Sequence, residues 1–370
     1  MRAKSCAVSG CLLAFAGGLA AAGEDPIDPF VSGEGGYHTY RIPALTVAPK
    51  GAVLLFCEGR KASAGDSGDI DLLLRRSLDG GRTWEPVRRL VDAGPDTAGN
   101  PAPVVDRKSG EVILLFSKNP GSASEGDILK GKGARTVWIA SSRDDGATWS
   151  DPREITGSVK RQGWTWYATG PCHGIQLRSG RLLVPCDHVE GPSPDYAASA
   201  HSHVIFSDDG GKTWAIGGVV AAGSDESAVA ELSGGEVVIN CRNYVSPKRR
   251  AVARSRDGGL TFGERTWDEG LPEPICQASL LALDRPGGGE RVLLFSNPAA
   301  LERRRLTVRA SRDGGKTWSA GRVVWAGPAA YSDLAVSASG DVLCAFERGE
   351  KSPYEKISVV RIPAPEINDL

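Results

Sequence analysis

Five copies of one eight-residue motif, S-x-D-x-G-x-T-W, recur along the chain and constrain its fold more than any other feature. The copies are Ser77–Trp84, Ser142–Trp149, Ser207–Trp214, Ser255–Phe262 and Ser311–Trp318, the fourth with Phe in place of Trp. Each copy predicts a tight turn, because its Asp accepts hydrogen bonds from nearby backbone amides and its Gly adopts a positive φ. The aromatic residue is expected to pack beneath the hairpin. Such self-similarity is typical of a repeat architecture.

A second series shows how many units there are. Apolar runs recur at Val53–Phe56, Val112–Phe116, Leu182–Val184, Val237–Ile239, Val292–Phe295 and Val342–Phe346. Each run has a strand pattern before and after it, and a further strand follows each aromatic turn, which makes four strands per unit. The many turn residues, 47 Gly and 23 Pro, favour strands and turns over long helices. The chain is therefore predicted to be an all-β, six-bladed β-propeller, with blades at about residues 31–362 of a domain over 23–370.

The alternation of strand direction predicts which residues share a face. If the strands of a blade are labelled A to D from the hub outward, the C–D turns lie on one face. The starts of the A strands, the ends of the B strands and the B–C connections lie on the other. The repeated turns are therefore expected to be scaffold, because five turns on the back face cannot converge on one ligand.

The N-terminus has the layout of a secretory signal peptide over residues 1–22. Arg2 and Lys4 precede an apolar run that ends in small residues. Export to the periplasm or the medium is expected, with a lipid anchor on Cys11 as the less favoured alternative. No later run is long enough to cross a membrane. The balance of 44 basic and 45 acidic residues excludes the basic surface of a nucleic-acid-binding protein.

Six cysteines follow the expected signal, and none lies in a C-x-x-C pair. Zinc ligation is therefore not expected. Cys172 and Cys186 flank a predicted hairpin turn and are the favoured pair for a disulfide, while buried free thiols are the alternative.

Three arginines are predicted at the mouth of the hub. Arg41 opens the first A strand, Arg242 ends the fourth B strand, and Arg303 lies in the fifth B–C connection, next to Arg304 and Arg305. Three guanidinium groups in one small site repel one another unless an anion lies among them, and their planar forks match a carboxylate. The predicted ligand is a carboxylate. Taken singly, each would be an ordinary surface or blade-pairing arginine.

A nucleophile and two acids are predicted on the same rim. Tyr331 and Glu226 each begin an A strand, and a phenol attacks poorly unless a neighbouring carboxylate takes its proton. Glu231, inside the strand, is a weaker choice of base. Asp66 lies in a Gly-rich connection, Gly65-Asp66-Ser67-Gly68-Asp69, which suits a proton-transfer group. Asp69 and Asp71 compete for that role.

At this point the sequence resembles the exo-α-sialidases, whose repeats are called Asp boxes or bacterial neuraminidase repeats. The resemblance spans about residues 31–362. It covers the segments Tyr40–Leu45, Glu58–Arg60, Gly65–Asp69, Gly170-Pro171 with Gly174-Ile175, Glu226 with Glu231, Asn240–Arg242, Ser296–Pro298 and Tyr331–Leu334. Asp boxes alone are weak evidence for activity, whereas the ordered set of Arg, Tyr, Glu and Asp residues is specific.

The resemblance implies a role for each residue. Arg41, Arg242 and Arg303 would bind the carboxylate of a sialic acid, and Arg60 would contact its 4-hydroxyl. Tyr331 would be the nucleophile, Glu226 its base and Asp66 the general acid and base of a retaining hydrolysis. Sialidases, with their tyrosine nucleophile, are an exception among glycosidases. Electrostatics favours a tyrosine in this role, because the sugar's carboxylate repels an anionic nucleophile but not a neutral phenol.

Two positions depart from the family pattern. Asn100 stands where bacterial relatives often have an Asp near the 4-hydroxyl, and Cys172 and His173 follow Gly170-Pro171 where a Gly is usual. Residues Trp164, Trp166 and Tyr167 either line a pocket for the N-acetyl group or pack in the core.

The predicted function is release of terminal sialic acid from glycoproteins, glycolipids or oligosaccharides, with no cofactor, since no nucleotide or metal motif is visible. One alternative is a propeller that binds sialylated glycans without turnover, for which Tyr331, Glu226 and Asp66 would not be needed. Another is a trans-sialidase, or an enzyme that releases an anhydro product.

Overall fold

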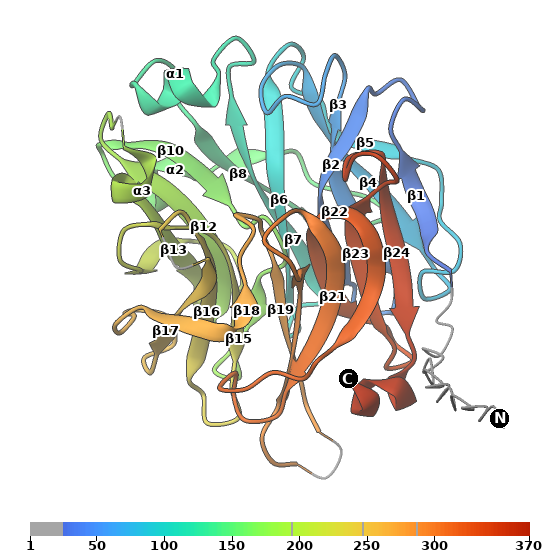
Figure 1. The fold of residues 1–370 in the computed structure, drawn as a ribbon. Helices are drawn as coiled ribbons and strands as arrows, with labels where there is room; N and C mark the ends of the chain where they lie inside the picture. The colour runs from blue at the N-terminus through green and yellow to red at the C-terminus, as the bar shows by residue number, and fades with distance from the viewer. Residues whose placement is uncertain (1–24, 194, 246–247, 286–287) are drawn as a thin grey trace, which may run out of the picture.

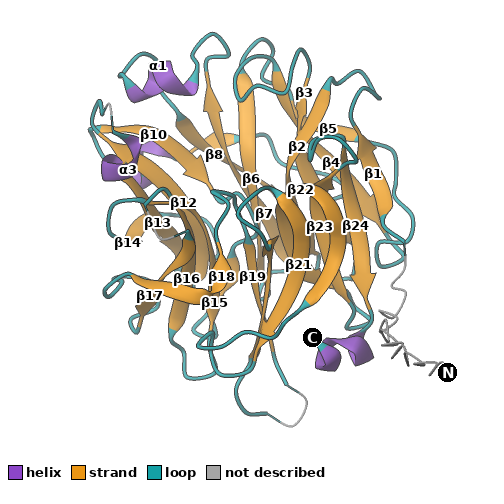
Figure 2. Ribbon diagram, in the orientation of Figure 1, coloured by secondary structure: helices purple, strands orange, loops and turns teal. Residues whose placement is uncertain are grey.

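The structure is a computed structural model that describes residues 25–370 except 194, 246–247 and 286–287. The expected signal segment, residues 1–22, and its Cys11 lie outside the described residues. The all-β prediction is confirmed, because strands dominate and the helices are short segments between them (Figure 2). None of the described helices is long and apolar enough to cross a membrane.

The strand pairings of the described residues form four sheets, and within these sheets we distinguish six successive groups of four main strands, which we call blades one to six. Blade one contains β2 (Thr39–Val47), β3 (Val53–Arg60), β4 (Ile70–Ser77) and β5 (Arg88–Val91). Blade two contains β6 (Thr97–Asp106), β7 (Glu111–Asn119), β8 (Thr136–Ser142) and β9 (Arg153–Glu154). Blade three contains β10 (Trp164–Thr169), β12 (Leu182–Glu190), β13 (Ala200–Ser207) and β14 (Ala215–Val219), with β11 (Ile175–Gln176) beside β12.

The remaining blades continue the pattern around the axis (Figure 1). Blade four contains β15 (Ser224–Glu231), β16 (Val237–Asn243), β17 (Arg249–Ser255) and β18 (Thr266–Pro272). Blade five contains β19 (Ser279–Leu283), β20 (Val292–Pro298), β21 (Arg304–Ser311) and the first part of β22 (Arg322–Val336). Blade six contains the second part of β22, β23 (Val342–Arg348), β24 (Lys356–Ile362) and β1 (Ile27–Val31).

Two features of this arrangement were not anticipated from the sequence. The long strand β22 serves two blades, pairing with β21 up to Pro328 and with β23 from Ala329 onward. The outer strand of blade six is β1, which comes from the opposite end of the described chain. The blue β1 and the red β24 lie side by side in Figure 1, and Phe30 pairs with Ile357. The ring is therefore closed by a strand from each end.

The five repeated turns form closely similar hydrogen-bond networks. In the first copy the Ser77 hydroxyl donates to Asp79 Oδ1 at 2.7 Å and accepts the backbone N–H of Gly81 at 2.8 Å. The Asp79 carboxylate also accepts the N–H and the hydroxyl of Thr83 at 2.9 and 2.6 Å. Gly81 has φ +87°, a conformation that glycine adopts without strain. The prediction of tight turns is confirmed.

The aromatic residue of each turn belongs to a core between two blades. Neighbouring blades enclose separate apolar clusters, and the aromatic packs into the cluster shared with the preceding blade; these residues are Trp84, Trp149, Trp214, Phe262 and Trp318. Blade six has no such turn. There the C-terminal 3₁₀ helix η1 (Ala364–Asp369) and the adjoining Leu370 supply Ile367 and Leu370 to the cluster between blades five and six.

The short helices lie in connections between strands. Helix α1 (Glu125–Leu129) and helix α3 (Tyr196–Ser199) occupy the B–C connections of blades two and three, and both lie in the upper left of Figure 2. Helix α2 (Thr156–Val159) follows β9. The six described cysteines are buried and free, so the favoured Cys172–Cys186 disulfide is absent and the alternative of buried thiols holds.

Candidate active site

The eight predicted site residues line one cavity at the hub. They are Arg41, Arg60, Asp66, Asn100, Glu226, Arg242, Arg303 and Tyr331. They come from A-strand starts, B-strand ends and B–C connections of five blades, as strand direction predicts. Arg41 and Tyr331, which are 290 residues apart in the sequence, thereby lie within a few ångströms of each other.

The phenol of Tyr331 is the centre of the site. Its hydroxyl donates to Glu226 Oε1 at 2.6 Å and accepts a hydrogen bond from Arg242 Nη1 at 2.9 Å. Arg242 Nη1 also donates to Glu226 Oε2 at 2.6 Å. Burial, reinforced by the Glu226 carboxylate, raises the pKa of Tyr331 well above its usual value, although three nearby arginines oppose that rise. Tyr331 is therefore a neutral phenol that already donates to a carboxylate.

Arg41 is held by a carboxylate that the sequence analysis missed. Glu347, fully buried at the end of β23, accepts Arg41 Nε at 2.8 Å, the Ile42 N–H at 2.8 Å and the Tyr331 N–H at 3.1 Å. One carboxylate thus orients both the arginine and the strand that positions the phenol. The sequence does contain a pattern that could have identified this residue, since Glu347 follows the sixth apolar run much as Arg242 follows the fourth.

Arg303 completes the arginine cluster. Its Nη1 donates to the Tyr354 hydroxyl and its Nη2 to the Ile275 carbonyl, both at 2.8 Å. The guanidinium groups of Arg41 and Arg303 lie 5.1 and 5.6 Å from the centre of the Tyr331 ring. Of the three adjacent arginines in this connection, Arg303 lines the cavity, while Arg304 and Arg305 are exposed.

Asp66 lies at the rim, with a side chain that is 59% exposed. Its Oδ1 is 2.7 Å from Arg60 Nη1 and 3.8 Å from Arg41 Nη1. Partial burial favours the neutral acid, but Arg60 and Arg41 outweigh it, so the pKa of Asp66 is lowered. The competing acids lie elsewhere, because Asp69 pairs with Lys61 and Asp71 accepts the Tyr37 hydroxyl.

Arg60 and Asn100 are joined through Glu58. Glu58 Oε2 accepts Arg60 Nη2 at 2.7 Å, and Glu58 Oε1 accepts the backbone N–H of Asn100 at 2.9 Å. Asn100 has φ +55°, and its Oδ1 accepts Arg135 Nη2 at 2.6 Å. The side-chain amide of Asn100 therefore offers a ligand its N–H groups rather than its oxygen. The weaker base candidate Glu231 accepts the Arg178 N–H and lines a different cavity.

The wall formed by blades two to four contains residues that the sequence analysis did not single out as site residues. They are Glu125, Arg135, Asp187, Tyr196, Asp225 and Tyr244. Burial raises the pKa of Asp225 to about 7; Arg242 opposes this rise and Glu226 adds to it. Of the three aromatic candidates, Trp166 lines the cavity, whereas Trp164 and Tyr167 pack in the core between blades two and three.

The chemistry of the cavity follows from its charges. Arg41 and Arg242 each have a carboxylate partner, Glu347 and Glu226, while Arg303 has none among the described residues. An anionic ligand therefore finds three converging guanidinium groups, one without a counterion, above a phenol paired with a base. No group of three His, Cys, Asp or Glu side chains suited to a metal ion occurs in the described part of the chain.

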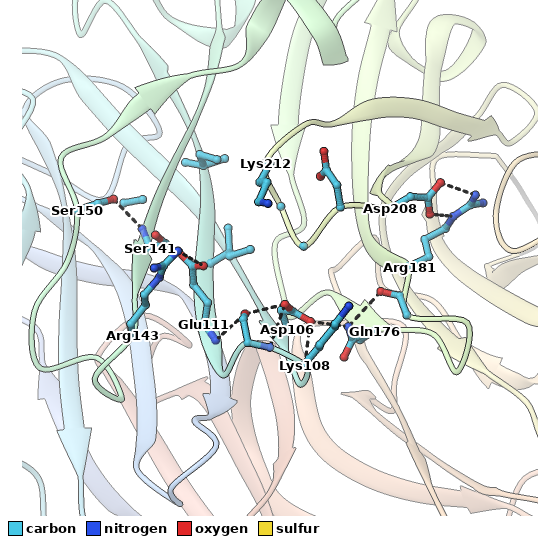
Figure 3. A pocket seen from close by; sticks show the side chains of 18 of the residues that line it. Asp106, Lys108, Glu111, Ser141, Arg143, Ser150, Gln176, Arg181, Asp208 and Lys212 are labelled. Carbon is cyan, nitrogen blue, oxygen red and sulfur yellow. Dashed lines mark hydrogen bonds and ion pairs between the residues drawn. The ribbon is translucent and has the colours of Figure 1, made fainter.

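A second and roomier cavity, of about 1210 Å³, lies beside the repeated turn of blade three and contains none of the eight predicted residues (Figure 3). Two of its arginines are paired with carboxylates. Arg181 Nε and Nη2 donate to the two oxygens of Asp208 at 2.7 and 2.9 Å, and Arg143 pairs with Glu111 at 3.2 Å. Figure 3 shows these pairs as dashed lines across the cavity wall. The cluster of arginines around a phenol paired with a carboxylate is in the hub cavity instead.

Known proteins match both the repeat and the whole fold. The family model described as a BNR repeat-like domain matches residues 51–344. A sialidase of Micromonospora viridifaciens is 35% identical over 369 residues, which cover 94% of this chain and 56% of that protein. Sialidase-3 of Bos taurus is 33% identical over 378 residues, covering 86% of this chain and 88% of its own length. The solved structure of Hadza microbial sialidase Hz136 superposes with a TM-score of 0.82 at 30% identity, covering 92% of this chain and 68% of that one.

Proposed function

Since the chain belongs to the exo-α-sialidase family, we propose that it hydrolyses terminal sialic acids from glycans and retains the configuration of the released sugar. The observation that supports this most directly is the contact of 2.6 Å between the Tyr331 hydroxyl and Glu226 inside the arginine cluster. A protein that only binds glycans has no need of a phenol paired with a base.

Binding uses charge and shape. The carboxylate of the sialic acid lies among Arg41, Arg242 and Arg303, where planar guanidinium groups give paired, charge-assisted hydrogen bonds. It supplies the counterion that Arg303 lacks among the described residues. Arg60 and the N–H groups of Asn100 face the 4-hydroxyl side of the sugar. This arrangement holds the anomeric carbon above Tyr331.

In the first step the Tyr331 oxygen attacks the anomeric carbon while its proton passes to Glu226. The phenol is neutral as it approaches, so the carboxylate on the same carbon does not repel it. The bond to the leaving oxygen breaks as Asp66 protonates that oxygen, and a tyrosyl glycoside forms. The exposed side chain of Asp66 exchanges protons with solvent before this step.

A general acid must hold its proton, so the lowered pKa of Asp66 has to rise when the substrate binds. Arg60 and Arg41 cause the lowering. A bound carboxylate neutralises Arg41 and adds negative charge near Asp66, and both effects raise the pKa of Asp66 in the complex. Substrate binding thus prepares the acid.

In the second step Asp66 takes a proton from water, which attacks the anomeric carbon from the face that the leaving group vacated. Glu226 returns its proton to the departing Tyr331 oxygen. Two attacks from opposite faces give net retention. We further propose that the protein is exported, on the basis of the signal-like residues 1–22.

The test is hydrolysis of a 4-methylumbelliferyl sialoside and of α2,3- and α2,6-sialyllactose, followed by NMR. We expect the α-anomer of sialic acid as the first product. A sialic acid released first as the β-anomer contradicts the tyrosyl mechanism. A 2,7-anhydro sugar as the main product favours an enzyme that releases an anhydro product, and a sialylated acceptor favours a trans-sialidase. Binding without turnover would mean that the protein binds sialylated glycans and does not hydrolyse them.

A further inference from the structure

Tyr354 contacts two of the three clustered arginines, although the steps derived above make no use of it. It lies in the connection between β23 and β24, the B–C connection of blade six. Its hydroxyl accepts a hydrogen bond from Arg303 Nη1 at 2.8 Å. The centre of its ring lies 4.2 Å from the guanidinium carbon of Arg41. One phenol thus joins arginines from blades one and five, and the sequence analysis did not single it out.

Arg303 depends on uncharged partners for its position. Its side chain is bonded, among the described residues, to the Tyr354 hydroxyl and to the Ile275 carbonyl. A long side chain that becomes immobilised only when a ligand arrives loses rotamer freedom, and this loss weakens binding. The loss is smaller when the side chain is already ordered. Tyr354 therefore orders Arg303 without adding a negative charge beside it.

Arg41 is held on its edge and on its face by different residues. Glu347 accepts Arg41 Nε at 2.8 Å and Nη2 at 3.4 Å, which fixes the edge of the guanidinium. The Tyr354 ring lies against the guanidinium within the range of a cation–π contact. Planar guanidinium groups stack on aromatic rings, so the ring restricts the tilt of Arg41 about the edge that Glu347 holds. The two contacts together set one orientation of Arg41.

The phenol of Tyr354 is itself anchored. Its backbone N–H donates to the Ser352 hydroxyl at 3.3 Å, and its carbonyl accepts the Ser32 hydroxyl at 2.8 Å, next to the end of β1. The ring packs against an apolar cluster formed by Ile42, Cys276, Ala330 and Tyr331. These contacts hold the ring in place, so it can in turn hold the two arginines.

Tyr354 is not part of the hydrogen-bonded pair that performs the attack. The Tyr331 hydroxyl is bonded to Glu226 and Arg242. The contacts of Tyr354 are with Arg41 and Arg303 instead. A change at Tyr354 should therefore disturb the site for the carboxylate and leave the nucleophile bonded to its base.

We propose that Tyr354 is a positioning residue for the carboxylate of the substrate. Its hydroxyl holds Arg303 and its ring holds Arg41 in the geometry that receives the anion, and it acts through these two arginines without touching the sugar. This inference rests on the function proposed above. A phenol suits the role because it accepts a hydrogen bond without supplying the counterion that the ligand itself supplies.

The experiment compares Tyr354→Phe and Tyr354→Leu with the native protein, and Tyr37→Phe is the matched control because its hydroxyl donates to Asp71 outside the cavity. Tyr354→Phe removes only the acceptor for Arg303, so KM for the 4-methylumbelliferyl sialoside should rise about three- to tenfold. Tyr354→Leu also removes the ring against Arg41, and a rise of about twenty- to hundredfold is expected. The kcat should stay within about twofold in Tyr354→Phe, because binding and not the attack is disturbed.

A double-mutant cycle tests whether the hydroxyl acts through Arg303. Tyr354→Phe is introduced into the native protein and into an Arg303→Met variant, and kcat/KM is measured at low substrate concentration. In the native protein kcat/KM should fall about three- to tenfold, whereas in Arg303→Met it should change by less than about twofold. If Arg303→Met hydrolyses too slowly to be measured, the KM and kcat of Tyr354→Phe decide the question.

An equal penalty in both backgrounds would overturn the inference. So would an unchanged KM in Tyr354→Phe, or a fall in kcat with KM unchanged, which would indicate a structural effect on the attack. Thermal unfolding of each variant separates loss of fold from loss of binding, and Tyr354→Phe remains informative if Tyr354→Leu does not fold. A native protein that hydrolyses no sialoside contradicts the proposed function instead.

Discussion

The two faces of the propeller use polar residues in opposite ways. On the face of the repeated turns, the same Ser, Asp and Thr side chains and Gly amide make the same hydrogen bonds in each copy, and the aspartates are exposed or half-buried. On the hub face the polar residues are mostly buried, and each has different partners. Repetition thus stabilises the ring, while chemistry depends on residues that occur once.

The acids of the two faces also differ in their ionisation. Hydrogen bonds from Ser255 and Thr261 lower the pKa of Asp257 in the fourth turn to about 2. Burial raises the pKa of Asp225 at the hub to about 7. An exposed acid that accepts several hydrogen bonds is stabilised as an anion, whereas a buried acid near other acids is stabilised as the neutral form. The following changes test this contrast, beginning with the largest expected effect.

Tyr331→Phe should reduce kcat/KM about a thousandfold or more while the unfolding midpoint changes little, because it removes the nucleophilic oxygen alone. The measurement is hydrolysis of the fluorogenic sialoside. Tyr37→Phe is the matched control, since its hydroxyl donates to Asp71 outside the cavity and activity should be kept. A Tyr331→Phe variant with more than about a tenth of native activity would contradict the assigned role.

Glu347→Gln should destabilise the fold by about 3–5 kcal/mol, because it removes the buried counterion 2.8 Å from Arg41 and leaves only the exposed Asp66 at 3.8 Å. KM should rise as well, since Arg41 loses its orientation. The control is Glu85→Gln, which breaks a more exposed pair with Arg76 at 3.2 Å and should cost no more than about 1 kcal/mol. Urea unfolding measures the stability of both variants, and hydrolysis of the fluorogenic sialoside measures KM. Equal losses in the two variants would contradict the buried role of Glu347.

Asp209→Asn in the third turn should cost about 1–2 kcal/mol of stability, because the Thr213 hydroxyl and amide lose a charged acceptor. The kcat/KM should not change, since this turn is on the opposite face. Asp208→Asn, one residue earlier, removes only the pair between the exposed Asp208 carboxylate and Arg181, and should change stability by less than about 1 kcal/mol. Altered kinetics in Asp209→Asn would show that the two faces are coupled.

The smallest effect is a difference in pH dependence. The pKa of Asp225 is higher in the folded protein than in the unfolded chain, so its contribution to stability is present below about pH 4 and is lost as the pH rises through 7. The pKa of Asp257 is lowered, so its contribution is present above about pH 4 and is lost as the pH falls toward 2.

Unfolding midpoints of the native protein, Asp225→Asn and Asp257→Asn, measured from pH 2 to 8, test these opposite signs. Relative to the native protein, Asp225→Asn should gain a few degrees between pH 4 and 8. Asp257→Asn should lose stability at pH 7 and approach the native value near pH 2. Parallel curves for the three proteins would mean that these carboxyls have the same pKa folded and unfolded.

Sequence patterns predict the repeated face better than the hub. The five turns and six apolar runs are local signals, and strand direction alone then places Arg41, Arg242 and Tyr331 on one rim. Glu347 and Asp187 also come after the apolar runs of their B strands. Whether such a side chain faces the hub depends on the strand register and on bulges such as the one between Trp164 and Tyr167. Arg135 lies in a connection with no periodic pattern, so no local signal identifies it.

The closure of the ring has a consequence for how the molecule is made. Asp28 on β1 is bonded to Arg348 and Lys356, 320 and 328 residues further along the chain. During synthesis β1 emerges long before β24, and its edge has no neighbour until nearly the whole polypeptide is available. Contacts between such distant segments form slowly, and an open strand edge invites association with other chains. Completion of blade six is therefore the step at which nascent molecules are most exposed to aggregation, and at which a chaperone would help most.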